Sequence, residues 1–245
     1  MKGIPETTTF YMPRAELSAG LEMEMYDLLS RHFEGVTREQ FRKDLDEKNR
    51  VIFLQRGGRL VGFSTLAVYE TTHEGEPVSV VCSGDTIVAP EAWNSTALSR
   101  TWIACVNELR RRYPRGKYVW LFLTSGFRTY RFLPVFWREF YPRFDAPMPA
   151  DRKRLLDFLA AERYGTQYDA ASGIVRFTRP QRLRDALGGI PPGKNGDAHV
   201  AFFLERNPCH AAGDELVCLT DLTDENLTPA GRRMAGARTH EACPC

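Results

Sequence analysis

The chain has 245 residues, of which 43% are hydrophobic and 26% charged, a composition typical of globular proteins with one large domain or two small ones. Its 33 basic and 31 acidic residues leave a formal net charge of +2, so the overall field gives no indication of a nucleic-acid partner. No apolar run is long enough to span a membrane and the N-terminus lacks a signal-peptide core, so we expect a cytoplasmic location.

Two helices are predicted before the first clear strand. Apolar residues at helical spacing over residues 14–33 indicate an amphipathic helix, and Gly35 follows it as a stop signal. Thr37 and Gln40 form a capping box, so a second helix is predicted to begin there.

A β-meander follows the two helices. Residues 51–55 and 60–69 are β-rich runs, and Gly57-Gly58 between them is a hairpin signal. A third strand is predicted from Val78 onward, after a short loop. These three strands are consecutive, which favours an antiparallel arrangement.

The pattern then changes from strands to a crossover. A helix capped by Asn94 or Ser95 has apolar residues on one face as far as Leu109. Residues 118–123 are wholly apolar, which is typical of a buried strand paired in parallel. Residues 80–123 therefore predict a βαβ unit attached to the meander.

Shorter elements are predicted over the rest of the chain. The aromatic stretch 127–140 contains Pro134 and is either one kinked helix or two short ones. The remaining predictions are a helix capped by Asp151, a strand over 172–177, a helix over 182–187, a loop over 188–197, and strands over 200–204 and 216–219. We expect one domain over residues 1–228 with an insertion around 145–198, and a disordered tail over 229–245.

This order of elements resembles that of the GNAT acyltransferase superfamily, over roughly residues 14–145 with the last strands completing it. The resemblance implies an α/β fold with a mixed sheet, in which an antiparallel meander precedes a βαβ unit with splayed central strands. In that family the gap between those strands admits the pantetheine arm of the donor. The order is also loosely similar to that of N-acyl amino acid synthases and acyl-homoserine lactone synthases, which use carrier-bound acyl chains.

The family holds the donor pyrophosphate in the turn that opens the central helix, and that turn usually contains a basic residue and two glycines. Here the strand ends near Val88 and the turn contains Trp93, Asn94, Ser95 and Thr96. Asn tolerates left-handed conformations and the two hydroxyls are potential donors. The donor is therefore either an acyl-CoA or an acyl carrier protein, which presents a single phosphate on its pantetheine.

Polar residues after the parallel strand complete the predicted donor site. Thr124 and Ser125 could position the pantetheine amides or stabilise an oxyanion. Arg128 and Arg131 lie among aromatic residues, where a guanidinium can stack on a ring as well as bind phosphate.

Acyl transfer to an amine requires a group that removes the amine proton and one that protonates the departing thiolate. Asp85 follows Gly84, which interrupts a β-rich strand in the manner of a bulge or a close ligand approach. In position Asp85 resembles the acidic residue that some family members use as a base through water, although it could equally hydrogen-bond a neighbouring turn. The family's tyrosine acid falls on the helix after the parallel strand, which favours Tyr130 over Tyr141.

The sequence therefore predicts a GNAT-type N-acyltransferase that moves an acyl group from acyl-CoA or an acyl carrier protein to a small-molecule amine. No metal is expected, because the five histidines lack ligand-like spacing. Asp214 and Glu215 could contact the amine, although a hairpin turn explains them equally well. A non-catalytic protein that binds an acyl or CoA-like ligand on the same scaffold is the alternative, suggested by the missing glycines.

Overall fold

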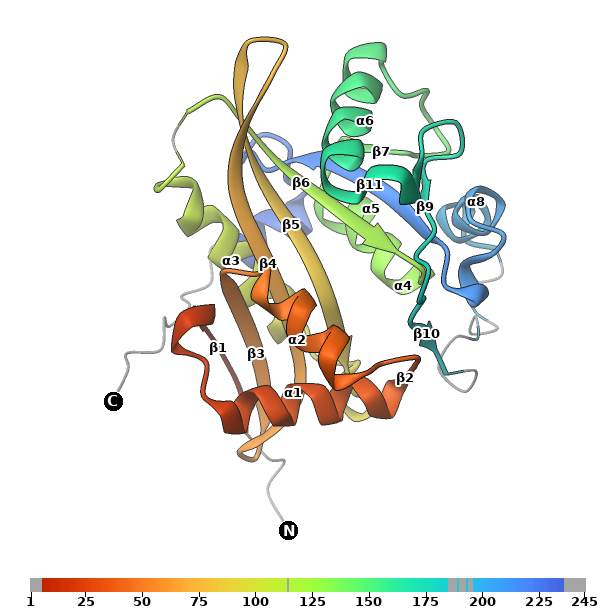
Figure 1. Ribbon diagram of the computed structural model, residues 1–245. Helices are drawn as coiled ribbons and strands as arrows, with labels where there is room; N and C mark the ends of the chain where they lie inside the picture. Colours follow the sequence, from red (N-terminus) through yellow and green to blue (C-terminus); the bar gives the residue numbers. More distant parts are fainter. Residues whose placement is uncertain (1–5, 114, 185–188, 190–192, 194–195, 236–245) are drawn as a thin grey trace.

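The computed structural model describes residues 6–113, 115–184, 189, 193 and 196–235. Its centre is a mixed sheet with strand order β1-β3-β4-β5-β6-β11-β9-β8, to which β7 is added beside β11 (Figure 1). A separate short pair joins β10 to β2. The strands are β1 (Thr7–Pro13), β2 (Phe33–Glu34), β3 (Arg50–Arg56), β4 (Arg59–His73), β5 (Glu76–Val88), β6 (Lys117–Thr124), β7 (Phe140–Tyr141), β8 (Tyr168–Asp169), β9 (Ile174–Val175), β10 (Arg182–Leu183) and β11 (Glu215–Asp221).

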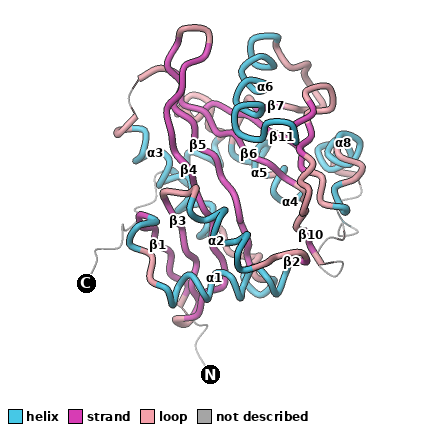
Figure 2. Tube along the Cα trace, viewed as in Figure 1, coloured by secondary structure: helices cyan, strands magenta, loops and turns pink. Residues whose placement is uncertain are grey.

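Helices cover both faces of this sheet. In Figure 1, α1, α2 and α6 lie in front of the strands, whereas α3, α5 and α9 lie behind them. The tube in Figure 2 shows the same arrangement, with the strands of the sheet running between the two groups. The helices are α1 (Ala19–His32), α2 (Arg38–Asp46), α3 (Ala97–Arg110), α4 (Phe127–Tyr130), α5 (Phe132–Phe136), α6 (Ala150–Tyr164), α8 (Ala198–Arg206) and α9 (Pro229–Ala235).

The N-terminal half follows the sequence pattern closely. The side chain of Thr37 accepts a hydrogen bond from the Gln40 amide at 3.2 Å and so caps α2. Strands β3, β4 and β5 form the predicted antiparallel meander. Gly57 and Gly58 both have positive φ in the hairpin between β3 and β4, a conformation that glycine adopts without strain. The sequence did not indicate β1, which pairs with β3 at the edge of the sheet.

The βαβ unit divides the core into two apolar layers. Val80, Val119 and Leu121 point to the face covered by α6 and pack against its leucines. The residues that follow or precede these along the strands, such as Val81 and Trp120, point to the other face and belong to the larger apolar cluster that includes α3. Alternation along the strands therefore buries both faces of β5 and β6, as expected for parallel strands. The predicted mixed α/β fold is confirmed.

Two predictions in the region before β11 are wrong. Residues 200–204, predicted as a strand, lie in α8, whose first turn is capped by the side chain of Asp197. A five-residue apolar run does not distinguish a strand from a buried helix. Residues 182–183, predicted as helical, form β10 because they pair with β2 far away in the sequence, and residues 185–188 lie outside the described residues.

Smaller differences concern element boundaries and the tail. The helix predicted to be capped by Asp151 already begins at Ala150, after Pro149. The strand predicted over 172–177 is limited to β9. Residues 229–235, predicted as disordered, form α9, which contacts α3 and α5. The aromatic stretch after β6 forms two short helices, α4 and α5, which is one of the two forms expected.

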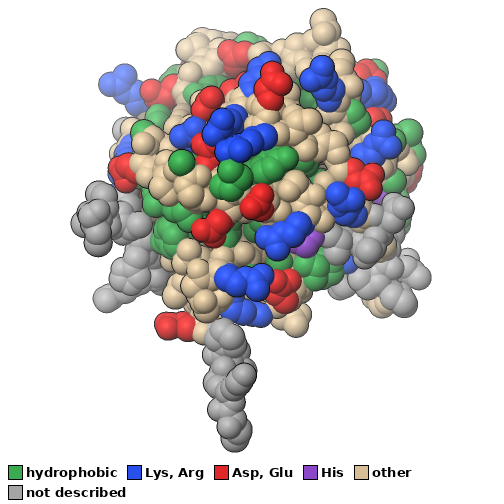
Figure 3. Space-filling view, turned by 60° about the horizontal axis from the view of Figure 1, so that its bottom comes forward, with side chains coloured by type: hydrophobic (Ala, Val, Ile, Leu, Met, Phe, Trp, Pro, Cys, Tyr) green, Lys and Arg blue, Asp and Glu red, His purple; other side chains and the backbone are tan. Residues whose placement is uncertain are grey.

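No helix among the described residues combines the length and apolarity needed to cross a membrane. The face shown in Figure 3 carries basic and acidic side chains interspersed with apolar ones. This mixture is in keeping with the small net charge of the sequence.

Gly116, which precedes β6, should be intolerant of any side chain. Its φ is +64°, and a Cβ there would lie 1.9 Å from the carbonyl oxygen of Pro77 at the start of β5. We expect Gly116→Ala to lower the free energy of unfolding by about 2–4 kcal/mol, from the left-handed backbone and the overpacking together. Gly58 has a similar φ of +76° but nothing within 4 Å, so Gly58→Ala should cost only about 1–2 kcal/mol. Urea unfolding measures both, and equal losses would contradict the steric argument.

Candidate active site

The gap between β5 and β6 is the structural centre of the candidate site. The parallel register runs from Val78 opposite Lys117 to Ser83 opposite Phe122, and the pairing ends there although β5 continues to Val88. The two strands therefore separate towards their carboxyl ends. The splay expected from the resemblance is present.

A β-bulge in β5 lies next to the point of separation. Two residues of β5, Asp85 and Thr86, lie opposite a single residue of β4, Ser64, because the register shifts there by one residue. Asp85 has a φ of +34°, an uncommon conformation for a non-glycine residue that Asp tolerates better than most. A bulge bends its strand and redirects a side chain, so the interruption at Gly84 is the bulge that the sequence indicated.

The carboxyl group of Asp85 lies in an unusual environment. Its Oδ2 atom is shut off from solvent and has no hydrogen-bond partner among the described residues. Burial raises the pKa of Asp85 to about 6, while the cation of Lys48 opposes this shift and the charge of Asp44 adds to it. Lys48 is held by a hydrogen bond from its Nζ to the carbonyl of Asp44 at 3.0 Å. Asp85 is thus a carboxylate that is ionised near neutral pH and has no hydrogen bond at Oδ2.

Glu215, which is half-buried, supplies a second carboxyl group beside this site. It is the first residue of β11, and burial, followed by the charge of Asp85, raises its pKa to about 8. Its neighbour Asp214 instead forms an ion pair with Arg176, with 3.1 Å between Oδ2 and Nε. The sequence suggested either a substrate contact or a hairpin turn for both Asp214 and Glu215. Of the two, Glu215 is the one whose pKa is affected by the charge of Asp85.

The end of α6 completes this side of the site, and the sequence gave no signal for it. The Tyr164 hydroxyl lies 3.5 Å from the Cys82 sulfur of β5. Burial, followed by the nearby Cys82, raises the pKa of Tyr164, and Glu215 adds to the shift. Arg163 reaches Glu47 beyond the end of α2, with 3.2 Å between Nη2 and Oε2. This ion pair links α6 to α2 across the front of the sheet.

The predicted phosphate-binding residues come together at the start of α3. The indole Nε1 of Trp93 donates a hydrogen bond to the Val88 carbonyl at 2.8 Å. The guanidinium carbon of Arg128 lies 4.4 Å from the centre of the Trp93 ring, which fixes α4 beside this turn. The residue at the N-cap position of the helix is Thr96, whose side chain makes no capping hydrogen bond, rather than the predicted Asn94 or Ser95. Asn94 is exposed, and the Ser95 hydroxyl accepts a hydrogen bond from the Ala97 amide.

The remaining predicted donor residues have structural partners. Thr124 donates a hydrogen bond through Oγ1 to the Gly126 carbonyl at 2.8 Å, which shapes the turn after β6, and Ser125 is half-buried in that turn. Arg131 forms an ion pair with Asp197 at the cap of α8, with 3.0 Å between Nε and Oδ2. Of the two arginines, Arg128 is the one that the structure joins to the α3 turn.

The two candidate tyrosines, Tyr130 and Tyr141, make their contacts with residues other than Asp85 and Glu215. Tyr130 is fully buried, its hydroxyl donates to the Pro142 carbonyl at 2.8 Å, and its ring packs against Phe203. Burial raises the pKa of Tyr130, as do Cys218 and Asp145, whereas Arg143 opposes the shift. Tyr141 pairs with Leu219 in the sheet. The structure places Glu215 close enough to Asp85 for the Asp85 charge to raise its pKa, and the role of either tyrosine as the acid stays a prediction.

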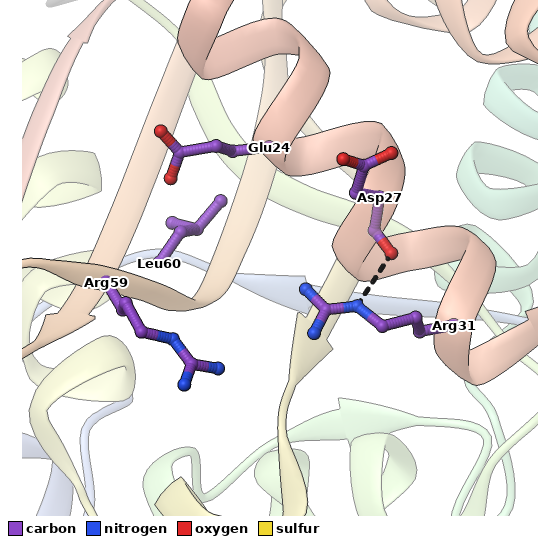
Figure 4. Close-up of a pocket in the computed structure, with 5 residues that line it drawn as sticks. All are labelled: Glu24, Asp27, Arg31, Arg59 and Leu60. Atoms are coloured by element: carbon purple, nitrogen blue, oxygen red, sulfur yellow. Dashed lines mark hydrogen bonds between the residues drawn. The ribbon is translucent and has the colours of Figure 1, made fainter.

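A surface hollow lies elsewhere on the protein, between α1 and the start of β4. It has a volume of about 230 Å³ and is lined by residues of α1 and the start of β4, namely Glu24, Asp27, Arg31, Arg59 and Leu60. Figure 4 shows the Arg31 guanidinium bonded back to the Asp27 carbonyl of its own helix, at 3.0 Å. The described lining contains none of the residues predicted for acyl transfer, so this hollow is separate from the splay.

The strand order, the bulge in β5 and the separation of β5 from β6 define a GNAT-type fold. The chain is thus a divergent example of that fold, as its sequence indicated.

Comparison with known proteins finds similarity among solved structures alone. No protein-family model matches the sequence, and no curated protein does either. Among solved structures the chain is similar to a GCN5-related N-acetyltransferase from Kribbella flavida, at 12% identity over 53% of this chain and 32% of that chain with a TM-score of 0.40. It is also similar to a conserved protein of unknown function from Enterococcus faecalis V583, a probable N-acyltransferase, at 12% identity over 88% of this chain and 66% of that chain with a TM-score of 0.43.

A third similar structure is an acyl-CoA N-acyltransferase from Pseudomonas aeruginosa, at 13% identity over 49% of this chain and 80% of that chain with a TM-score of 0.37. The chain spans less than two thirds of the length of the first two structures. These TM-scores are low, so the fold is defined by the strand order and the splay rather than by the similarities.

Proposed function

We propose that this protein transfers an acyl group from a pantetheine thioester to an amine, with Asp85 as the general base. The observation that carries the proposal is the buried, unpartnered Oδ2 of Asp85 at the bulge where β5 leaves β6. A thioester arm lying in the gap would put its carbonyl carbon beside this carboxylate. The base would then accept a proton from the attacking amine, directly or through one water.

The properties of Asp85 suit this role. A base works best when its pKa lies near the working pH, and burial moves the pKa of this carboxyl upward to about 6. The Lys48 cation keeps it from rising further, so the group remains mostly ionised at pH 7. The strained φ at Asp85 is of the kind that accumulates at functional sites.

The start of α3 would bind a phosphate of the donor. Its first-turn amides carry the positive end of the helix dipole, and the first turn contains no acidic residue. Arg128 lies at this turn, stacked on Trp93, and a guanidinium can bind phosphate through two parallel hydrogen bonds. The donor would thus be acyl-CoA or an acyl carrier protein, both of which carry a phosphate on the pantetheine arm.

A thiol-release assay tests this function. Purified protein is mixed with acetyl-CoA, a long-chain acyl-CoA or an acyl carrier protein, each against a panel of small amines. We expect amine-dependent thiol release with at least one donor, and the preferred donor identifies which phosphate carrier is used. Saturable donor binding without turnover over the whole panel would instead favour a non-catalytic protein that binds an acyl or CoA-like ligand.

Arg128→Ala should weaken donor binding without slowing the chemical step. Loss of a hydrogen bond to a charged group costs about 1.5–3 kcal/mol, so KM for a phosphate-bearing donor should rise about 10-fold or more while kcat changes little. An acyl-pantetheine that lacks the phosphate should be used equally well by the variant and the parent protein. Steady-state kinetics with both donors measures the difference.

Arg111→Ala is the matched control. Arg128 lies beside the start of α3, whereas Arg111 follows the last residue of α3, so this change removes a cation from the far end of the helix. It should leave KM for both donors unchanged. If Arg111→Ala raises KM as much as Arg128→Ala does, the contribution is a general positive field rather than a phosphate site.

A further inference from the structure

We propose that Glu215 is the general acid of this site: it donates a proton to the departing thiolate while Asp85 takes the proton of the amine. The inference rests on the proposed acyl transfer and assigns one of its two proton-transfer roles. It starts from Tyr130, whose hydroxyl proton is committed to the Pro142 carbonyl inside an aromatic cluster. A donor at the splay must then come from another element.

The register of β11 places Glu215 at the open end of the gap. Strand β11 is antiparallel to β6, and Leu216 lies opposite Thr124, the last residue of β6. Glu215 is therefore level with the end of β6, beyond the last paired position of β5 and β6 at Ser83. The strands have already separated at this level.

The same strand pattern settles the face to which Glu215 belongs. Val217 and Leu219, two and four positions further along β11, pack in the apolar cluster under α6. Alternation along a strand puts Glu215 on that face as well. Cys82 of β5 contacts Tyr164 of α6 on this face, and the charge of Glu215 acts on Tyr164. Glu215 thus faces the front of the gap, where β5 bears its bulge.

The charged groups around the two carboxyls give them different protonation states. Lys48 and Asp44 act on Asp85 from the end of α2, and the charge of Asp85 acts on Glu215. On the α6 side, Tyr164 lies next to Arg163, whose cation is paired with Glu47. With pKa values of about 6 and about 8, the pair holds one proton at neutral pH, and Glu215 carries it. Two coupled carboxyls with separated pKa values divide the roles of base and acid.

The proton balance of the reaction closes on this pair. The amine nitrogen forms a bond to the thioester carbon, and Asp85 accepts the proton that the nitrogen loses. The carbon–sulfur bond then breaks, and the leaving sulfur takes the proton of Glu215 to give the free thiol. The amide and the thiol depart, and the proton on Asp85 returns to Glu215 directly or through solvent. The pair ends with the one proton with which it began.

Glu215→Gln tests the inference because it keeps the shape of the neutral acid but has no acidic proton to give. We expect kcat/KM with an alkyl thioester to fall about 10²-fold. With an alkoxyamine acceptor that is already deprotonated, the parent protein should lose activity as pH rises through about 8, where Glu215 ionises. The variant should lack this descending limb. Asp214→Asn is the matched control, because its carboxylate is paired with Arg176 at the surface and should change neither property.

A second measurement separates acid catalysis from a structural role. S-ethyl and S-phenyl thioacetate are compared as small donors, because the thiophenolate leaves without help from an acid and the ethanethiolate does not. The deficit of Glu215→Gln should be at least about tenfold larger with the ethyl thioester. Equal deficits with both thioesters, or a descending limb that persists in the variant, would overturn the assignment. Absence of turnover by the parent protein would overturn the proposed function itself, whereas active parent and unaffected Glu215→Gln would overturn this inference alone.

Discussion

Asp85→Asn is expected to lower kcat/KM by about 10²–10⁴-fold, the range that a positioned general base contributes. The amide keeps the shape of the side chain at the bulge but cannot accept a proton from the amine. Donor binding should change little, because the phosphate contacts proposed at Trp93 and Arg128 lie on other elements. The measurement is thiol release at saturating donor together with a separate determination of donor affinity.

Asp44→Asn provides the control for this prediction through the pH profile. The charge of Asp44 helps to raise the pKa of Asp85, so its removal should lower that pKa. The ascending limb of activity, which reports ionisation of Asp85, should then move to lower pH while the maximal rate is retained. An Asp85→Asn variant with full activity, or an Asp44→Asn variant with an unmoved limb, would show that Asp85 is not the base.

The same Asp85→Asn change should make the folded protein more stable. The pKa of Asp85 rises on folding from 3.8 to about 6, so below pH 3.8 the group is protonated in both states and costs nothing. Between pH 3.8 and about 6, Asp85 is ionised in the unfolded chain but still protonated in the folded protein, so the free energy of unfolding falls as pH rises. Above about pH 6 this loss of stability is complete. At pH 7 the variant should gain about 1–3 kcal/mol, and below pH 4 the gain should vanish. Urea unfolding at both pH values measures this.

The local sequence pattern was sufficient to predict those features whose structure depends only on neighbouring residues. The cap at Thr37, the glycine hairpin of β3 and β4, and the bulge after Gly84 all depend on neighbouring residues, and each was predicted. Asp85 was found for the same reason, since a glycine that interrupts a strand indicates a bulge or a ligand approach.

The elements that the sequence missed depend on distant partners. Strand β10 exists because it pairs with β2, about 150 positions earlier in the chain, as the Arg184–Glu34 contact beside it illustrates. The approach of Tyr164 to Cys82 spans 82 positions, and Glu215 gains its raised pKa only when β11 closes the sheet near Asp85. No periodicity or motif encodes such proximity, so the second carboxyl of the site could be named from the sequence but not placed.

The aromatic cluster behind the splay should be the most sensitive part of the core. The Trp120 ring of β6 lies with its centre 4.2 Å from that of Phe122, 4.3 Å from Trp102 and 5.0 Å from Trp137. Its Nε1 also donates a hydrogen bond to the Ser83 hydroxyl at 2.8 Å. Ser83 is the residue of β5 in the last parallel pair before the gap, so Trp120 joins the core to the edge of the site.

Trp120→Ala is therefore expected to lower the free energy of unfolding by about 3–5 kcal/mol, as for other buried aromatic truncations, and to raise KM for the donor by loosening β5 against β6. Trp120→Phe retains most of the packing but not the hydrogen bond to Ser83, so its stability loss should be smaller while its effect on KM persists. Val135→Ala, at a position 38% exposed, should stay within about 0.5 kcal/mol of the parent protein. If Trp120→Phe leaves KM unchanged, the bond to Ser83 serves the core alone, and the width of the gap must be set by the bulge at Asp85.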